Sequence, residues 1–234
     1  MTGLKNIILL HGALGSSAQL EKLAELLNDK FNVFLLNFSG HGKNSNPPES
    51  ISIDKLGQEL TSFIEKHKIL EPNIFGYSLG GYVGLYAATK SLVPFNSVIT
   101  LGTKFDWSDK TYMEQFSFVD SEVLLSKYPA VIESLVHLHG DNWSSLVNYT
   151  KEFLIDLGNN PRLDPAELLK LQSKVLITRG DRDKTVFEAE SRRIADILPN
   201  GTYVEIPATP HIIERVDPTT LAAMIIEFLE ITKH

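Results

Sequence analysis

The chain has 234 residues, and its 22 Lys and Arg against 29 Asp and Glu give a formal net charge of −7 at pH 7. It contains no cysteine, which excludes disulfides and thiolate metal sites. The acidic balance disfavours binding to nucleic acid or to an anionic membrane surface, and no apolar run is long enough to span a bilayer, so we expect a cytoplasmic protein.

Short apolar runs alternate with segments of helical periodicity over the first hundred residues, a pattern typical of βαβ units around a parallel sheet. The apolar runs predict strands at Asn6–Leu10, Val33–Asn37, Asn73–Phe75 and Ser97–Leu101. The periodic segments predict helices at Leu20–Leu27, Asp54–Lys66 and Leu79–Lys90.

The alternation stops between Phe105 and Leu163, where aromatic and apolar residues recur at irregular helical spacing. We interpret residues 105–163 as an inserted helical subdomain and residues 1–104 and 164–234 as the core that carries it. The core resumes with elements of both kinds: a helix at Pro165–Leu171, strands at Lys174–Thr178 and Tyr203–Ile206, a helix capped by Thr185 and Glu188, and a last helix that begins at Asp217-Pro218.

A serine lies in a glycine-rich connection between a predicted strand and a predicted helix. Gly76-Tyr77-Ser78-Leu79-Gly80 follows Asn73–Phe75 directly. A turn this sharp strains the central residue and leaves room only for glycine two positions before and after it. The pattern therefore predicts Ser78 as a nucleophile, while a plain helix-capping turn is the structural alternative.

A serine nucleophile needs a base to take its proton and an acid to orient that base. His211 follows the strand Tyr203–Ile206, and Asp181 and Asp183 follow Lys174–Thr178, so all of them fall at the carboxyl edge of the predicted sheet. The chain order serine, acid, histidine is the one found on open α/β sheets with such a turn.

With these motifs the sequence resembles the α/β-hydrolase family over essentially its whole length. The matching pieces are His11-Gly12-Ala13, Gly40-His41-Gly42, the turn around Ser78, Gly180–Asp183 and His211. The resemblance implies an α/β fold with a mostly parallel sheet of about six strands flanked by helices, and it makes residues 105–163 a helical cap. It also favours Asp183 over Asp181 as the acid and implies a triad of Ser78, Asp183 and His211.

An oxyanion hole is expected from two backbone N–H groups. Leu79 follows the nucleophile, and the resemblance places the second donor at Ala13. Tyr77, Trp107 and Phe116 are the candidate pocket residues. His11 is interpreted as a brace for the oxyanion loop, and no metal or other cofactor is expected because ligand spacing is absent; His137 and His139, two apart, are assigned to the surface or to the cap pocket.

The resulting hypothesis is a serine hydrolase that cleaves a carboxylic ester of a small uncharged substrate through an acyl-enzyme. Thioester or carbon–carbon bond hydrolysis on the same triad remains open, as does a receptor or signalling protein with slow turnover or a pseudoenzyme. The menaquinone-pathway lyase of this fold is disfavoured, because its relatives place an arginine soon after the serine, where this chain has Tyr82. The oligomeric state is not predicted.

Overall fold

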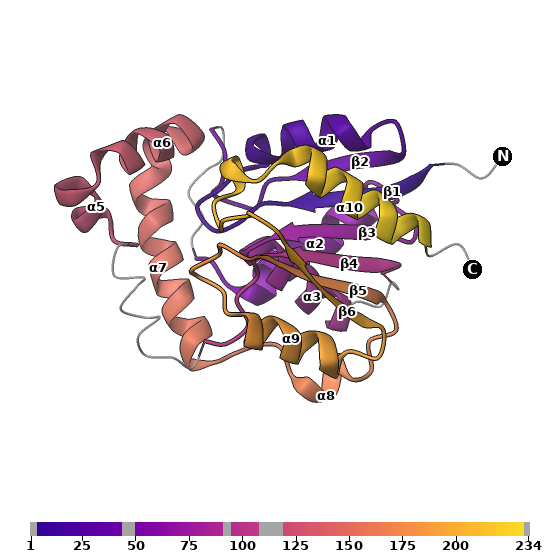
Figure 1. Cartoon of the computed structure of the whole chain (residues 1–234). Helices are drawn as coiled ribbons and strands as arrows, with labels where there is room; N and C mark the ends of the chain where they lie inside the picture. Colours follow the sequence, from indigo (N-terminus) through magenta and orange to yellow (C-terminus); the bar gives the residue numbers. More distant parts are fainter. Residues whose placement is uncertain (1–3, 44–49, 91–94, 108–118, 232–234) are drawn as a thin grey trace.

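Six parallel strands form the centre of the molecule in the computed structural model, which describes residues 4–43, 50–90, 95–107 and 119–231 (Figure 1). In spatial order the strands are β2 (Phe31–Leu36), β1 (Lys5–Leu10), β3 (Asn73–Tyr77), β4 (Ser97–Leu101), β5 (Lys174–Gly180) and β6 (Gly201–Ile206). The predicted parallel sheet of about six strands is therefore confirmed, with strand ends that shift by at most two residues.

The strand register brings the carboxyl ends of the strands to one edge. Leu10 lies opposite Leu36 and Gly76, Leu101 lies opposite Tyr77, and the last residues of β5 and β6 are also paired. Residues that follow these strands consequently meet at a single edge of the sheet.

Helices cover both faces of the sheet. The inner strands β1, β3, β4 and β5 are largely buried, whereas the edge strands β2 and β6 keep exposed residues. One face carries α1 (Glu21–Leu27) and α10 (Pro218–Ile231), which lie together in Figure 1. The other carries α2 (Ile53–Lys66), α3 (Leu79–Lys90) and α9 (Glu188–Ile197). Successive residues of β1 point to opposite faces of the sheet, so Ile7 and Ile8 enter different hydrophobic cores.

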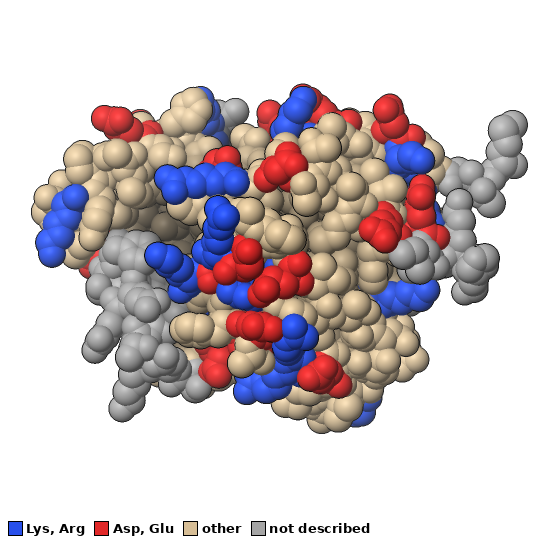
Figure 2. Space-filling view, viewed as in Figure 1, with Lys and Arg blue, Asp and Glu red and all other residues tan. Residues whose placement is uncertain are grey.

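Between β4 and β5 the described chain is helical. It forms α5 (Ser121–Lys127), α6 (Pro129–His139), α7 (Trp143–Asn159) and the short α8 (Pro165–Leu168). Figure 1 shows α5, α6 and α7 beside the carboxyl edge of the sheet. None of the helices within the described ranges is long and apolar enough to cross a bilayer. On the face in Figure 2, acidic and basic side chains are intermixed.

The predicted Thr185 cap of the fifth core helix is wrong. The helix begins at Glu188, with Phe187 as its N-cap, because the Phe187 N–H donates to Glu190 Oε1 at 2.8 Å. The Thr185 N–H instead donates to Asp183 Oδ1 at 2.7 Å. In contrast, the last helix begins as predicted, with N–H groups of Thr219 and Thr220 donating to Asp217.

The connection from β3 to α3 is packed against backbone on both sides. A Cβ added at Gly76 would lie 2.3 Å from the Gly81 nitrogen, and one at Gly80 would lie 2.5 Å from the Leu10 oxygen. Neither neighbour can yield as a side chain can. The glycines that the sequence motif contains are thus required by close backbone approach.

Gly76→Ala should lower the free energy of unfolding by about 1–3 kcal/mol or more, because backbone atoms must move to admit a methyl group. Urea denaturation followed by circular dichroism measures the change. Gly57→Ala in α2 is the matched control: its Cβ meets only the Tyr86 ring, at 3.1 Å, and alanine favours the helix. Equal stability of the Gly76 variant and the parent protein would contradict the packing argument.

Candidate active site

Ser78 occupies a strained backbone conformation at the carboxyl edge of the sheet. Its φ is +52°, a region that residues with a Cβ rarely adopt. The conformation is held at both ends, because the Ser78 N–H donates to Leu101 O at 2.8 Å and the Thr103 hydroxyl donates to Ser78 O at 2.9 Å. Strain that is fixed so firmly is typical of functional positions.

His211 and Asp183 form a hydrogen-bonded pair at the same edge. His211 Nδ1 and Asp183 Oδ2 are 2.7 Å apart, and the Asp183 side chain is only 1% exposed. Burial raises the pKa of Asp183, but the bond to His211 and the N–H groups of Thr185 and Val186 outweigh it, so the pKa lies below its usual value. Asp183 is thus an anion that fixes the orientation of the imidazole.

Asp181 has a different environment from Asp183. It is exposed, and its Oδ1 accepts the Thr209 N–H at 3.1 Å. The backbone N–H of Ala208, together with that of Thr209, lowers its pKa. Asp181 therefore ties down the loop that leads to His211, and the structure brings Asp183 to the imidazole.

The loop after β1 is braced by His11. Gly12 O accepts hydrogen bonds from His11 Nδ1 at 2.8 Å and from the Gly15 N–H at 3.1 Å. In a trans peptide the carbonyl and the following N–H point in opposite directions. Because Gly12 O points toward His11 Nδ1, the Ala13 N–H of the same peptide unit points away from His11.

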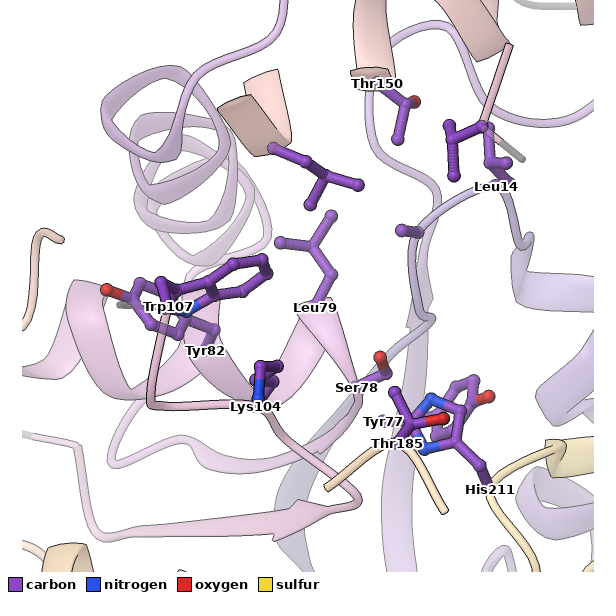
Figure 3. A pocket seen from close by; sticks show the side chains of 13 residues that line it. Leu14, Tyr77, Ser78, Leu79, Tyr82, Lys104, Trp107, Thr150, Thr185 and His211 are labelled. Atoms are coloured by element: carbon purple, nitrogen blue, oxygen red, sulfur yellow. The ribbon is translucent and has the colours of Figure 1, made fainter. Parts of the chain in front are cut away.

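A cavity of about 240 Å³ joins these groups. Figure 3 shows Ser78, Tyr77, Thr185 and His211 near one another in this cavity, with Lys104 between Trp107 and Ser78. The described residues that line it are Ala13, Leu14, Tyr77, Ser78, Leu79, Tyr82, Lys104, Trp107, Val119, Thr150, Leu154, Thr185 and His211.

Most of the predicted site residues meet at this cavity. Ser78, His211, Ala13 and Leu79 line it, together with Tyr77 and Trp107, and Asp183 lies behind His211. Phe116 lies outside the described residues. Lys104, Thr150 and Thr185 were missed, because only the folded chain brings the loop after β4, helix α7 and the loop after β5 to one wall. Within the described ranges, no cluster of three or more His, Asp or Glu side chains could hold a metal ion.

Three buried histidines lie beside the loop after β1. The His11 and His41 ring centroids are 4.8 Å apart, and those of His41 and His139 are 5.8 Å apart. His139 comes from α6: its Nε2 donates to Leu14 O at 2.9 Å, and its Nδ1 accepts the Gly42 N–H at 3.1 Å. His139 thus joins α6 to the loop after β1. Its neighbour His137 is exposed, so the two histidines, which were given the same interpretation from the sequence, differ in the structure.

Burial keeps these imidazoles neutral. It lowers the pKa of His11 from 6.5 to about 4 and is also the main cause of the lowered pKa values of His41 and His139. The unfolded chain takes up protons near pH 6.5, before the native protein can. Stability is therefore fully present above pH 6.5 and is lost as the pH falls toward 4.

The free energy of unfolding should consequently fall between pH 6.5 and pH 4, by roughly 3 kcal/mol from His11 alone. Urea denaturation at a series of pH values measures this loss. His139→Gln, which replaces one imidazole by an amide without charge, should reduce the loss. His137→Gln makes the same change at an exposed site of the same helix and is the control. An unchanged pH dependence in the His139 variant would refute this assignment.

Known proteins resemble this chain in sequence and in fold. The sequence matches the family model described as alpha/beta hydrolase fold over residues 5–122, about half of the chain. A probable alcohol acetyltransferase of Cyberlindnera jadinii is 20% identical over 97% of this chain and 75% of its own. A 2-succinyl-6-hydroxy-2,4-cyclohexadiene-1-carboxylate synthase of Yersinia pseudotuberculosis is 27% identical over 95% and 86%. The structure of a thermophilic esterase from Thermogutta terrifontis has a TM-score of 0.76 at 20% identity, covering 98% and 90% of the two chains.

Proposed function

The chain belongs to the α/β-hydrolase family, and on that premise we propose that it is a cofactor-independent serine hydrolase acting on a carboxylic ester of a small molecule. One observation carries the proposal: the strained Ser78 shares a cavity with His211, and the Nδ1 atom of His211 is bound to the buried Asp183. A turn that only capped a helix would not need this pair beside it.

The mechanism follows from the positions of these groups. Because Asp183 holds His211 Nδ1, the Nε2 atom is left to accept the proton of the Ser78 hydroxyl. The Ser78 Oγ attacks the ester carbonyl, and the N–H groups of Ala13 and Leu79 stabilise the negative oxygen. Protonated His211 then gives its proton to the departing alcohol. Water hydrolyses the acyl-enzyme in the same way and releases the acid.

The named relatives support chemistry at an acyl carbon. An acetyltransferase and an esterase both carry names that describe acyl transfer, to an alcohol or to water. The synthase is a reminder that the fold supports other reactions. The menaquinone-pathway lyases of this fold place an arginine soon after the serine, where this chain has Tyr82. The Tyr82 hydroxyl accepts the N–H groups of Arg162 and Leu163, and its side chain lines the cavity.

Residues 105–163 act, in this proposal, as a cap that covers the site. Support comes from α7, which contributes Thr150 and Leu154 to the cavity wall, and from the His139 contact with Leu14. Such a cap restricts the size of the substrate and excludes bulk water from the reacting groups.

Ser78→Ala should lower turnover of short nitrophenyl esters by several orders of magnitude, because it removes the nucleophile. Steady-state release of nitrophenolate measures turnover, and circular dichroism checks the fold. The parent protein should turn over many times per molecule, whereas a receptor of this fold would release about one equivalent and stop. Retention of a tenth of the activity in the variant would overturn the assignment of Ser78.

Asp183→Asn should lower kcat by roughly three to four orders of magnitude, since a neutral amide no longer stabilises the imidazolium or its tautomer. Asp181→Asn is the matched control: Asp181 lies two residues away and accepts the Thr209 N–H, whereas Asp183 is bonded to His211, and the variant should retain most of the activity. The same nitrophenyl assay compares the two. If the Asp181 variant lost more activity than the Asp183 variant, the acid would be misassigned.

A further inference from the structure

One side chain of helix α6 reaches the loop after β1. His139 is the last residue of α6, which lies beside the carboxyl edge of the sheet in Figure 1, and its side chain is buried. Its Nδ1 accepts the Gly42 N–H at 3.1 Å, so the ring proton of the neutral imidazole lies on Nε2. Nε2 donates that proton to Leu14 O at 2.9 Å. The imidazole therefore bonds two separate loops of the core.

The bond from His139 begins a chain of hydrogen bonds through the loop after β1. Leu14 O and the Gly15 N–H belong to one peptide unit, and the Gly15 N–H donates to Gly12 O at 3.1 Å. Gly12 O in turn belongs to the peptide unit that carries the Ala13 N–H. Each bond polarises the next peptide unit, which makes the last N–H a stronger and better oriented donor.

The backbone at Leu14 is strained and needs such support. Its φ is +56°, and the bond that closes residues 12–15 into a β-turn puts Leu14 at the third position, where a positive φ favours glycine or asparagine. A leucine stays in that conformation only when its surroundings hold it. The bond from His139 fixes the peptide group that follows Leu14.

The same arrangement occurs at the nucleophile. Ser78 has a φ of +52°, and its carbonyl accepts the Thr103 hydroxyl at 2.9 Å. Figure 3 shows Ser78 and Leu14 at the same cavity, and both line it. Thr103 follows β4 in the core, whereas His139 belongs to residues 105–163, the proposed cap.

We propose that His139 is a positioning residue for the reaction: by holding Leu14 O, it orients the Ala13 N–H toward the negative oxygen of the transition state. This inference rests on the proposed function, in which Ala13 and Leu79 supply the oxyanion hole. Residues 105–163 therefore complete the catalytic site in addition to lining the cavity. The role of His139 requires the donor at Nε2, and the bond to Gly42 only sets the tautomer.

Two amide variants separate the two bonds of His139. In His139→Gln the amide nitrogen can take the place of Nε2 and donate to Leu14 O, whereas the shorter side chain of His139→Asn ends at the place of Nδ1, beside Gly42. With 4-nitrophenyl butyrate, His139→Asn should lower kcat about tenfold or more and change KM by less than about threefold, because the oxyanion bond forms only in the transition state. His139→Gln should restore kcat to within about threefold of the parent value.

The matched control is His137→Asn, which makes the same change at an exposed position of the same helix and should leave kcat and KM unchanged. His139→Leu fills the site without either hydrogen bond, and it replaces the asparagine variant if circular dichroism shows that the latter does not fold. An unchanged kcat in the asparagine and leucine variants, or an equal loss in the glutamine variant, would overturn the proposal.

Hydrogen exchange keeps the inference separate from the esterase function. A peptic peptide that covers residues 11–16 should exchange about tenfold faster, or more, in His139→Asn than in the parent protein, because the turn opens once Leu14 O is released. His139→Gln should exchange like the parent protein. If the parent protein turned over no nitrophenyl ester, the esterase function would be refuted, and this comparison would still decide whether His139 holds the turn. Equal exchange in all three proteins would refute the positioning role.

Discussion

The turn at Ser78 is the constraint on which the site depends. Its positive φ needs close backbone contact, which Gly76 and Gly80 permit, and it needs the bond from the Ser78 N–H to Leu101 O. These contacts exist only if β3 lies between β1 and β4. The sheet order thus fixes the serine, and the register that aligns the strand ends brings His211 to the same edge.

A second layer of contacts keeps the site rigid by using backbone partners. Asp183 accepts two N–H groups besides its bond to the imidazole, and Glu190 accepts three. His11 and His139 each bind one carbonyl and one N–H. Buried polar groups whose hydrogen bonds are all satisfied favour one arrangement of the loops, and here backbone groups supply most of those bonds.

The core elements could be predicted because their patterns are local. The helix that begins at Asp217-Pro218 and the turn around Ser78 depend on residues that are neighbours in sequence, and both lie where the sequence places them. The predicted helix cap at Thr185 was wrong because it depends on competition between several hydrogen-bonding groups. The cap of α9 is completed by Glu190 and the backbone of Phe187, while Asp183 takes the Thr185 N–H; a motif of spacing alone does not reveal that competition.

The remaining features depend on contacts between distant segments. His139 and His137 are equivalent in sequence, but only one reaches Leu14, 125 residues away. Lys104 lines the cavity because β4 ends beside β3, and its partner Glu190 is 86 residues further along the chain. Helical periodicity has no information on such pairings. This explains why the meeting of Ser78, Asp183 and His211 at one sheet edge could be predicted, whereas the other residues of the cavity wall could not.

The central claim is that Ser78 is a nucleophile activated by His211. Intact-mass analysis after treatment with a fluorophosphonate, followed by peptide mapping, tests it without knowledge of the substrate. The account predicts a single adduct on Ser78 that is absent from Ser78→Ala and strongly slowed in His211→Ala. No adduct, or an adduct on another residue that persists in the Ser78 variant, would contradict it.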